Sequence, residues 1–199
     1  AALSEELGRE LVVYPELKHP AHLRAAGLAT EEMIVNELAA FGLLGRDRPV
    51  WIQCFEPATL TRLRHDLGVE SPLLHLMAAG EAWEEPDVRA WSADADGIGP
   101  DKASVLTWGD AEAEIVGSDT AHGLGRSAKQ TGLVEAAHEA GLFVHPYTLR
   151  AENQFLPASL RSSDEPAAHG DLRAEVTAYL QAGVDGFFTD HTDIGVAAR

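Results

Sequence analysis

Two side chains of opposite charge lie two residues apart near the start of the sequence, at the end of the segment Val12–Lys18. The apolar, β-branched residues before them are typical of a buried strand, along which side chains alternate between two faces. Glu16 and Lys18 would therefore point the same way. Because an unpaired buried charge is costly, an acid and a base at the end of a strand favour a functional site over packing.

The chemistry of the two head groups suggests their roles. A carboxylate is a hard oxygen ligand suited to Ca²⁺ or Mg²⁺, which makes Glu16 a candidate metal ligand. The ammonium group of Lys18 is a point charge that suits an anionic group such as a phosphate. A structural ion pair that closes one end of a barrel is the alternative.

Polar side chains also follow other apolar runs. The amide of Gln53 either satisfies backbone groups or contacts a ligand. The run Leu142–Arg150 ends in the imidazole of His145, the phenol of Tyr147 and the guanidinium of Arg150. Taken alone, His145 is typical of a hydrogen-bonded core histidine, and Arg150 suits a bound phosphate or carboxylate as well as a surface salt bridge.

The other polar segments carry weaker signals. Asp94–Asp101 is acidic but lacks the spacing of an EF-hand loop, which favours a strand followed by a tight turn. Phe188 closes the last apolar run, where an aromatic ring could line a pocket, and Cys54 is interpreted as a small buried residue. No histidine pair has the spacing of a metal motif. The remaining histidines are scattered along the chain: His19, His22, His65, His75, His122, His138, His169 and His191.

Short apolar runs alternate with helical patterns, which predicts an α/β fold with a parallel sheet. Thr30 is predicted to cap one helix and Pro57 to open another, with Gly42 and Gly68 after their last turns. Two further helices are expected between residues 133 and 141 and between about 171 and 183. The predicted strands are Leu11–Pro15, Val50–Cys54, Leu73–Met77, Ala95–Gly99, Leu142–Pro146 and Gly186–Thr189.

The polar residues above lie at or just beyond the carboxyl ends of these strands, where (β/α)8 barrels and open doubly wound sheets both build their sites. The sequence has no Gly-x-Gly-x-x-Gly or Walker-type loop after a strand, which weakens a nucleotide-binding interpretation. Glu81–Ser92 and Ala151–Gly170 are predicted to be long loops on that face, where barrels keep their specificity.

Composition limits the possible partners. The formal net charge of −17 over 199 residues argues against general attraction to nucleic acids or anionic membranes. An anionic substrate is still compatible with this charge, because a bound divalent cation inverts the local field. No apolar run approaches the roughly 20 residues that span a bilayer, so no stable membrane insertion is expected.

Five segments together resemble the glycerophosphodiester phosphodiesterase family, particularly its secreted or periplasmic bacterial branch. They occur in the family's order along nearly the whole chain, which makes their combination more specific than any one of them. The segments are Tyr14–Lys18, Gln53–Phe55, Ala95–Asp101, His145–Arg150 and Ala182–Asp190.

This resemblance implies a (β/α)8 barrel that hydrolyses glycerophosphodiesters to glycerol 3-phosphate and an alcohol. In such enzymes three carboxylates hold a divalent cation, Ca²⁺ or Mg²⁺, and two histidines act as general acid and base. Glu16 corresponds to the third metal carboxylate and Lys18 to the phosphate-neutralising lysine. Five further residues correspond to positions near the substrate: Gln53, His145, Tyr147, Arg150 and Phe188.

The segments that carry both catalytic histidines and the other two metal carboxylates in the family do not precede the Glu16 strand here. We therefore expect residues 1–199 to be a single, N-terminally truncated domain with about six of the usual eight βα units. No catalytic residue is assigned within the chain, and it is expected to be inactive alone. The last segment also departs from the family, since His191 follows Asp190 where an aromatic residue and a proline are usual.

Two other functions remain open on the sequence. One is a non-catalytic barrel that binds phosphate or glycerophosphodiesters. The other is a different phosphodiester chemistry, resembling phospholipase D-like or phosphoinositide-cleaving enzymes. The resemblance implies a periplasmic or extracellular location, and unpaired sheet edges favour a homo-oligomer that covers them.

Overall fold

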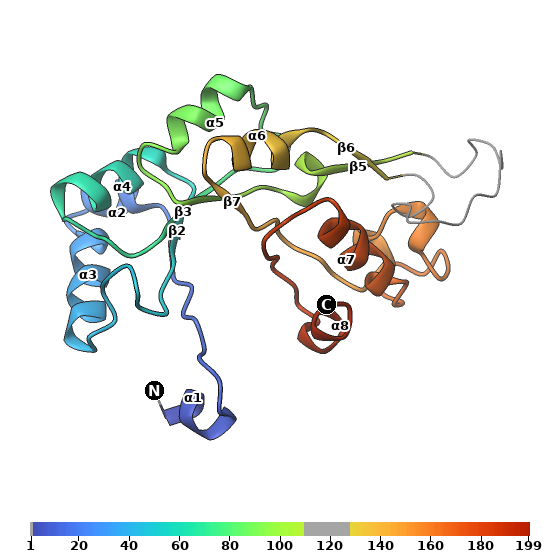
Figure 1. Cartoon of the computed structure of the whole chain (residues 1–199), viewed down its shortest axis with the longest axis horizontal. Helices are drawn as coiled ribbons and strands as arrows, with labels where there is room; N and C mark the ends of the chain where they lie inside the picture. Colours follow the sequence, from blue (N-terminus) through green and yellow to red (C-terminus); the bar gives the residue numbers. More distant parts are fainter. Residues whose placement is uncertain (1, 110–127) are drawn as a thin grey trace. The chain divides into compact units, whose positions relative to one another are not determined.

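The computed structural model describes residues 2–109 and 128–199 (Figure 1). These residues form two compact units. The first unit contains the described residues up to Met77 together with Glu84–Ile98. The second contains Ala78–Trp83 and the described residues from Gly99 onward.

The first unit is organised around short strands in the order β1-β2-β3-β4. Parallel pairing sets Glu16 of β1 opposite Gln53 of β2. Strands β2 and β3 also pair in parallel, with Cys54 opposite His75. Every residue of β2, β3 and β4 is buried, as expected for strands that are covered on both faces. The four strands are β1 (Glu16–Leu17), β2 (Ile52–Cys54), β3 (Leu73–Leu76) and β4 (Gly97–Gly99).

The first strand differs from its prediction. The sequence predicts a strand over Leu11–Pro15, but the strand of the structure is β1. Before β1, the predicted segment makes one parallel bridge, between Val13 and Val50. Pro15 has no N–H group to donate, although its carbonyl accepts from the backbone of Gln53 at 3.0 Å. Val13 is half exposed, so the expectation of a buried run there was wrong, and Glu16 lies within the strand.

Helices of the first unit begin at residues that suit helix starts. Pro57 lies in the first turn of α4 as predicted, and Gly68 follows the end of the π-helical turn η1 with φ +64°. Thr30 is the first residue of α3 and makes no side-chain cap, so that detail was wrong. The helical segments are α1 (Ala2–Leu7), α2 (Pro20–Ala25), α3 (Thr30–Ala40), α4 (Pro57–Thr61), η1 (Arg62–Asp66) and α5 (Glu85–Trp91).

Helix α5 occupies most of the segment Glu81–Ser92, which was predicted to be a loop. The side chains of Glu84 and Asp87 form a reciprocal capping box, and Pro86 lies in the first turn. Val88 is the buried residue of this helix. The high charge of the segment therefore reflects an exposed helix with one buried contact rather than a loop.

The second unit combines a parallel arrangement with an antiparallel pair that was not predicted. The pair sets Leu106 opposite Gln130 and Trp108 opposite Ala128. Parallel bridges join Asp101 to Tyr147 and Leu149 to Thr189. The strands are β5 (Leu106–Trp108), β6 (Ala128–Gln130) and β7 (Phe143–Val144). The predicted strand Gly186–Thr189 is thus present only as the bridge at Thr189.

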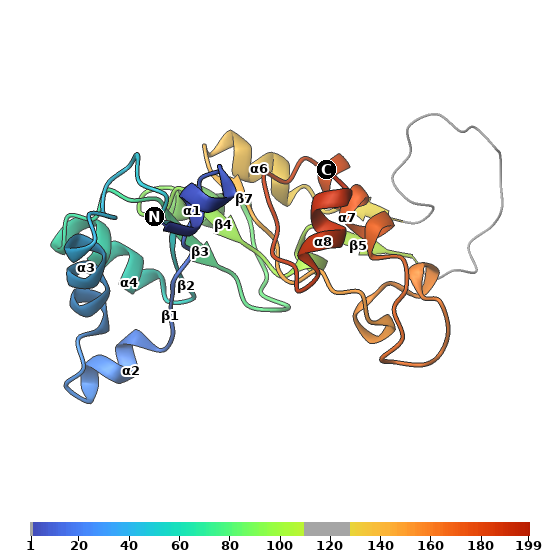
Figure 2. The same ribbon diagram turned by 90° about the horizontal axis from the view of Figure 1, so that it is seen from below.

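Helices of the second unit pack around a buried apolar core. Helices α7 and α8 lie side by side in both views (Figure 1 and Figure 2). Asp171 caps α7 by accepting from the backbone N–H of Ala174 at 3.0 Å. The helical segments are η2 (Lys102–Ser104), α6 (Leu133–Glu139), η3 (Asn153–Phe155), η4 (Ala158–Leu160), α7 (Leu172–Gln181) and α8 (Thr192–Ala197). The predicted loop 151–170 therefore contains two 3-10 turns.

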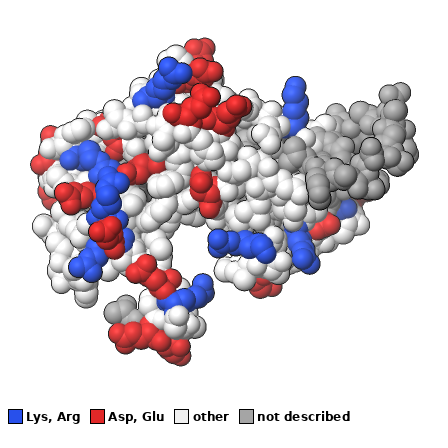
Figure 3. Space-filling view, in the orientation of Figure 1, with Lys and Arg blue, Asp and Glu red and all other residues white. Residues whose placement is uncertain are grey.

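Two buried carboxylates are neutralised within their own units. Glu31 of α3 is fully buried and pairs with Arg24. Glu175 of α7 is fully buried and contacts Lys102 Nζ at 2.7 Å. Figure 3 shows basic and acidic side chains next to one another over the helices of the first unit. Both fully buried carboxylates in the described part of the chain are therefore paired, as the high cost of a buried charge requires.

No helix among residues 2–109 and 128–199 combines the length and the apolar character needed to cross a bilayer.

Candidate functional site

In the first unit, Glu16 and Lys18 form an ion pair, with Glu16 Oε2 3.1 Å from Lys18 Nζ. The Lys18 side chain is 73% exposed and that of Glu16 is 20% exposed. The chain then turns sharply, because His19 adopts a left-handed conformation with φ 51° before α2 begins at Pro20. The ammonium group is therefore presented to solvent at the end of a strand, with one anionic partner.

The neighbouring strand fixes the other predicted residue of this unit. Gln53 is 8% exposed and lies opposite Glu16 in the parallel ladder. After β2, a carboxylate oxygen of Glu56 accepts from the backbone N–H of Ala21 at 3.0 Å, which ties the segment after Lys18 to β2. The structure thus places Glu16 and Gln53 opposite one another on two adjacent strands, with Lys18 directly after the first strand.

The free thiol of this unit is structural. Cys54 Sγ lies 3.3 Å from the carbonyl oxygen of Leu17 and 3.3 Å from the backbone nitrogen of Glu56. Burial raises the pKa of the Cys54 thiol, so little thiolate forms at neutral pH. This agrees with the interpretation of Cys54 as a small buried residue.

In the second unit, His145 is held as a neutral ring. Burial lowers the pKa of the His145 imidazole, and the carboxylate of Asp185 opposes this shift. The ring stacks on Phe143 with centroids 6.2 Å apart. A Cβ atom at Gly186 would lie 2.9 Å from His145 Nε2, so glycine at that position makes room for the ring.

Arg150 has a carboxylate and an aromatic ring as partners. Its Nε donates to Asp190 Oδ2 at 2.6 Å, and its guanidinium lies 4.7 Å from the centroid of the Phe155 ring. The predicted residues Tyr147 and Phe188 are held by backbone hydrogen bonds, from Tyr147 N to Pro100 O and from Phe188 N to Pro146 O. Arg150 therefore already forms a surface salt bridge, the alternative that the sequence left open.

One cluster of potential metal ligands was not predicted from the sequence. Among the described residues, one group of three side chains could hold a metal ion, namely Glu152, His169 and His191, whose donor atoms all lie within 4.8 Å of one another. Glu16 belongs to no such group. The departure at His191 from the family pattern was the only sequence signal for this cluster. His65 forms an ordinary pair instead, with Nε2 2.7 Å from Asp94 Oδ1.

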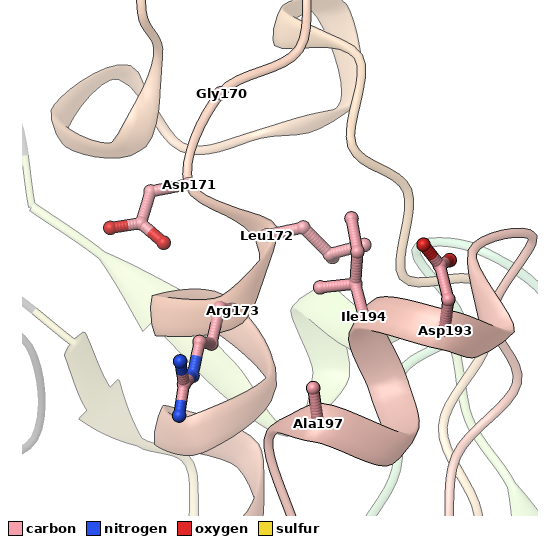
Figure 4. Close-up of a pocket in the computed structure, with 7 residues that line it drawn as sticks. All are labelled: Gly170, Asp171, Leu172, Arg173, Asp193, Ile194 and Ala197. Atoms are coloured by element: carbon pink, nitrogen blue, oxygen red, sulfur yellow. The ribbon is translucent and has the colours of Figure 1, made fainter.

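A shallow pocket of about 330 Å³ lies between the start of α7 and helix α8. Figure 4 shows the side chains of Leu172 and Ile194 directed toward one another, with the carboxylate of Asp193 beside them. The lining residues are Gly170, Asp171, Leu172, Arg173, Asp193, Ile194 and Ala197. None of the residues predicted to contact substrate lines this pocket.

Comparison with known proteins places the chain in a family. Residues 6–194 match the model of the glycerophosphoryl diester phosphodiesterase family. This chain belongs to that family. It is 29% identical over 201 residues to "Glycerophosphodiester phosphodiesterase GDPD6" of Arabidopsis thaliana, a match that covers 92% of this chain and 50% of the relative.

A solved structure supports the same fold. A protein from Silicibacter pomeroyi DSS-3 named for glycerophosphoryl diester phosphodiesterase activity matches with a TM-score of 0.60 and 17% identity, over 98% of this chain and 52% of that one. The chain therefore spans about half the length of both relatives. The α/β class and the barrel family are confirmed, whereas the bacterial branch, the truncated single domain and the individual site residues stay predictions.

The family depends on a divalent cation, so we tested whether the described residues fit one near Glu16. A Ca²⁺ ion takes about six to eight oxygen ligands, usually from several carboxylates. Glu16 is instead paired with an ammonium group, and Glu56 is engaged by a backbone N–H. The described part of the first unit does not by itself form a cage for Ca²⁺ or Mg²⁺.

Proposed function

We propose that the protein to which this chain contributes hydrolyses glycerophosphodiesters to glycerol 3-phosphate and an alcohol. Two observations support this activity. The family model matches nearly the whole chain, and an exposed lysine follows a parallel strand at the position of the family's phosphate-binding lysine. The match to the family model carries the proposal.

Each predicted residue takes a role that its own surroundings allow. Lys18 binds a phosphate oxygen. Glu16, which pairs with its ammonium group in this chain, is proposed as one of the three metal carboxylates of the whole enzyme. Gln53 contributes an amide from the middle of the adjacent strand β2. By the family correspondence, His145, Tyr147, Arg150 and Phe188 stay proposed substrate-binding residues. Within the second unit, His145 is held as a neutral ring and Arg150 shares its guanidinium with Asp190.

We further propose that the chain alone does not turn over. General acid–base catalysis contributes typically about 10²–10⁴-fold, and the family pattern assigns neither of its two histidines to this chain. The cation of the whole enzyme, Ca²⁺ or Mg²⁺, would neutralise phosphate charge when bound, but one carboxylate is too few to hold it. The chain therefore supplies residues that bind the phosphate.

Product analysis tests the activity. The natural full-length protein, incubated with glycerophosphocholine and Ca²⁺ or Mg²⁺, is expected to release glycerol 3-phosphate and choline, whereas the 199-residue chain releases neither. Choline phosphate or a cyclic phosphate as the product would overturn the proposed reaction in favour of a different phosphodiesterase. Turnover by the isolated chain that Glu16→Gln abolishes would overturn the proposed inactivity.

The proposal extends to location and assembly. On the family resemblance alone, the enzyme is proposed to act outside the cytoplasm, which cell fractionation tests. Strand β1 lies at the end of the strand order within the first unit, so we propose that, when the 199-residue chain is made alone, a second copy covers the edge at β1. A monodisperse monomer in light scattering would contradict this assembly.

A further inference from the structure

Three segments of the second unit bring a carboxylate and two imidazoles together. Glu152 follows the bridged residue Leu149, His169 precedes α7, and His191 is the residue before α8. The Nε2 atom of His191 lies 3.4 Å from Oε2 of Glu152. The two imidazole rings are 5.0 Å apart between centroids and nearly perpendicular, at 81°. One donor atom from each residue lies within 4.8 Å of the other two.

Contacts that do not involve the three donor side chains hold their segments in this arrangement. Glu152 and His169 face one another in an antiparallel bridge, and Gly170 N donates to Ala151 O at 2.8 Å. A Cβ atom at Gly170 would lie 2.4 Å from the carbonyl oxygen of Leu160, so only glycine fits there. On the third segment, His191 N donates to Thr189 Oγ1 at 3.0 Å. The segments that carry the three donors are therefore already held in place by hydrogen bonds.

The distance between His191 and Glu152 matches the requirement of a transition-metal ion. Zn²⁺ binds imidazole and carboxylate donors at about 2.0–2.2 Å, so neighbouring donors in a tetrahedral site lie roughly 3.3–3.6 Å apart. The separation of 3.4 Å between His191 and Glu152 already meets this condition. His169 is exposed, so its ring has room to turn toward the other two donors.

We propose that Glu152, His169 and His191 form a binding site for a divalent transition-metal ion such as Zn²⁺. Two imidazoles and one carboxylate suit Zn²⁺ or Co²⁺ better than the oxygen-seeking Ca²⁺ and Mg²⁺. Three protein ligands leave a coordination position for water or an anion. The bound ion joins the segment at Glu152 and the loop at His169 to the start of α8.

The charges around the site support metal binding. Glu152 supplies the anionic donor of the set, 3.4 Å from His191 Nε2, and a deprotonated carboxylate is the form that binds a metal ion. Asp190 is adjacent in sequence to His191 and pairs with Arg150. The charges of Asp190 and Arg150 compensate one another, so the charge of Glu152 is available to attract a metal ion.

Ordinary histidine–carboxylate pairs provide matched controls. His138 Nε2 lies 2.9 Å from Asp185 Oδ2, and His65 Nε2 lies 2.7 Å from Asp94 Oδ1. Both contacts are shorter than the one between His191 and Glu152, and neither pair belongs to a group of three donors among the described residues. A site that depends on three donors should lose its metal when a triad residue changes, and keep it when His138 changes.

Calorimetry with Zn²⁺ on the 199-residue chain, without a histidine tag, tests the proposal. We expect one Zn²⁺ per chain, resistant to excess Ca²⁺, and a loss of affinity of at least about 10-fold in Glu152→Gln, His169→Gln and His191→Gln. His138→Gln should bind as the wild type does. The absence of Zn²⁺ binding would overturn the proposal. Binding equal to that of the wild type in the variant that combines Glu152→Gln, His169→Gln and His191→Gln would also overturn it.

Two further measurements keep the test independent of folding and of catalysis. His169 is exposed, so His169→Gln should retain the wild-type circular dichroism spectrum and lose the rise in Tm that Zn²⁺ gives the wild type. Co²⁺ should give visible absorption bands of a four-coordinate ion in the wild type only. Identical bands in His169→Gln would contradict the proposal, whatever the outcome of the assays with glycerophosphodiesters.

Discussion

Each unit of this chain has a pair formed by a glutamate and a lysine, and the two pairs differ mainly in burial. Glu16 and Lys18 are 3.1 Å apart, and the lysine side chain is 73% exposed. Glu175 and Lys102 are 2.7 Å apart, with the carboxylate fully buried and the lysine 18% exposed. An exposed ammonium can exchange its partner for a bound anion, whereas a buried one is committed to its carboxylate. The comparison teaches that exposure, rather than residue type, separates a candidate site from a structural pair.

The buried pair should produce the largest effect when it is broken. Lys102→Met leaves Glu175 without its cation, and we expect the free energy of unfolding at pH 7 to fall by about 3–5 kcal/mol. Urea denaturation followed by circular dichroism measures this change. The control is the double variant Lys102→Met/Glu175→Leu, which removes both charges and should recover most of the loss. A single variant as stable as the wild type would erase the distinction between the two pairs.

The buried carboxylate also predicts a pH dependence. Burial raises the pKa of Glu175 despite the opposing effect of Lys102, so the folded protein binds this proton more tightly than the unfolded chain. The free energy of unfolding should therefore decrease as pH rises from about 4.5 through the raised pKa, by at most about 1.4 kcal/mol per pH unit. In Glu175→Gln this slope should vanish from denaturation curves recorded across that window. An unchanged slope in the variant would contradict the assignment.

His145 should give a smaller dependence of opposite sign. Its pKa is lowered by burial, so folding favours the neutral ring. The resulting stability is present above the ordinary histidine pKa of 6.5 and is lost as pH falls from there through the lowered pKa. The carboxylate of Asp185 opposes the shift and so reduces this contribution. Denaturation of His145→Gln between pH 5 and 8 should show a flatter profile; a steeper one would refute the neutral ring.

The sequence predicted the repeated strand–helix order well, because each element has a local signal. Pro57 and Gly68 bound a helical segment with residues whose backbone preferences are strong. The β5–β6 pair was missed because it joins segments that are separated along the chain, and no short-range pattern specifies such a pairing. Helix α5 was missed because its charged surface resembled that of a loop.

The candidate site divides in the same way. Glu16 and Lys18 are neighbours in sequence, so alternation along one strand was enough to place them together. Glu152 and His191 are 39 residues apart, and their segments are joined by the parallel bridge between Leu149 and Thr189, which no spacing rule anticipates. The spacing of the three donor residues along the chain does not predict a metal site, because metal motifs are recognised by local spacing.

The exposed pair should matter little for stability and strongly for ligand binding, and that contrast is the central claim. Lys18→Met should change the free energy of unfolding by less than about 1 kcal/mol. The decisive measurement is calorimetry of glycerol 3-phosphate binding to the chain, with Lys129→Met, on an exposed lysine of β6, as the control. We predict binding that weakens about 10-fold in Lys18→Met and is unchanged in Lys129→Met. Equal affinity in Lys18→Met and the wild type, or no binding by the wild type, would contradict the account.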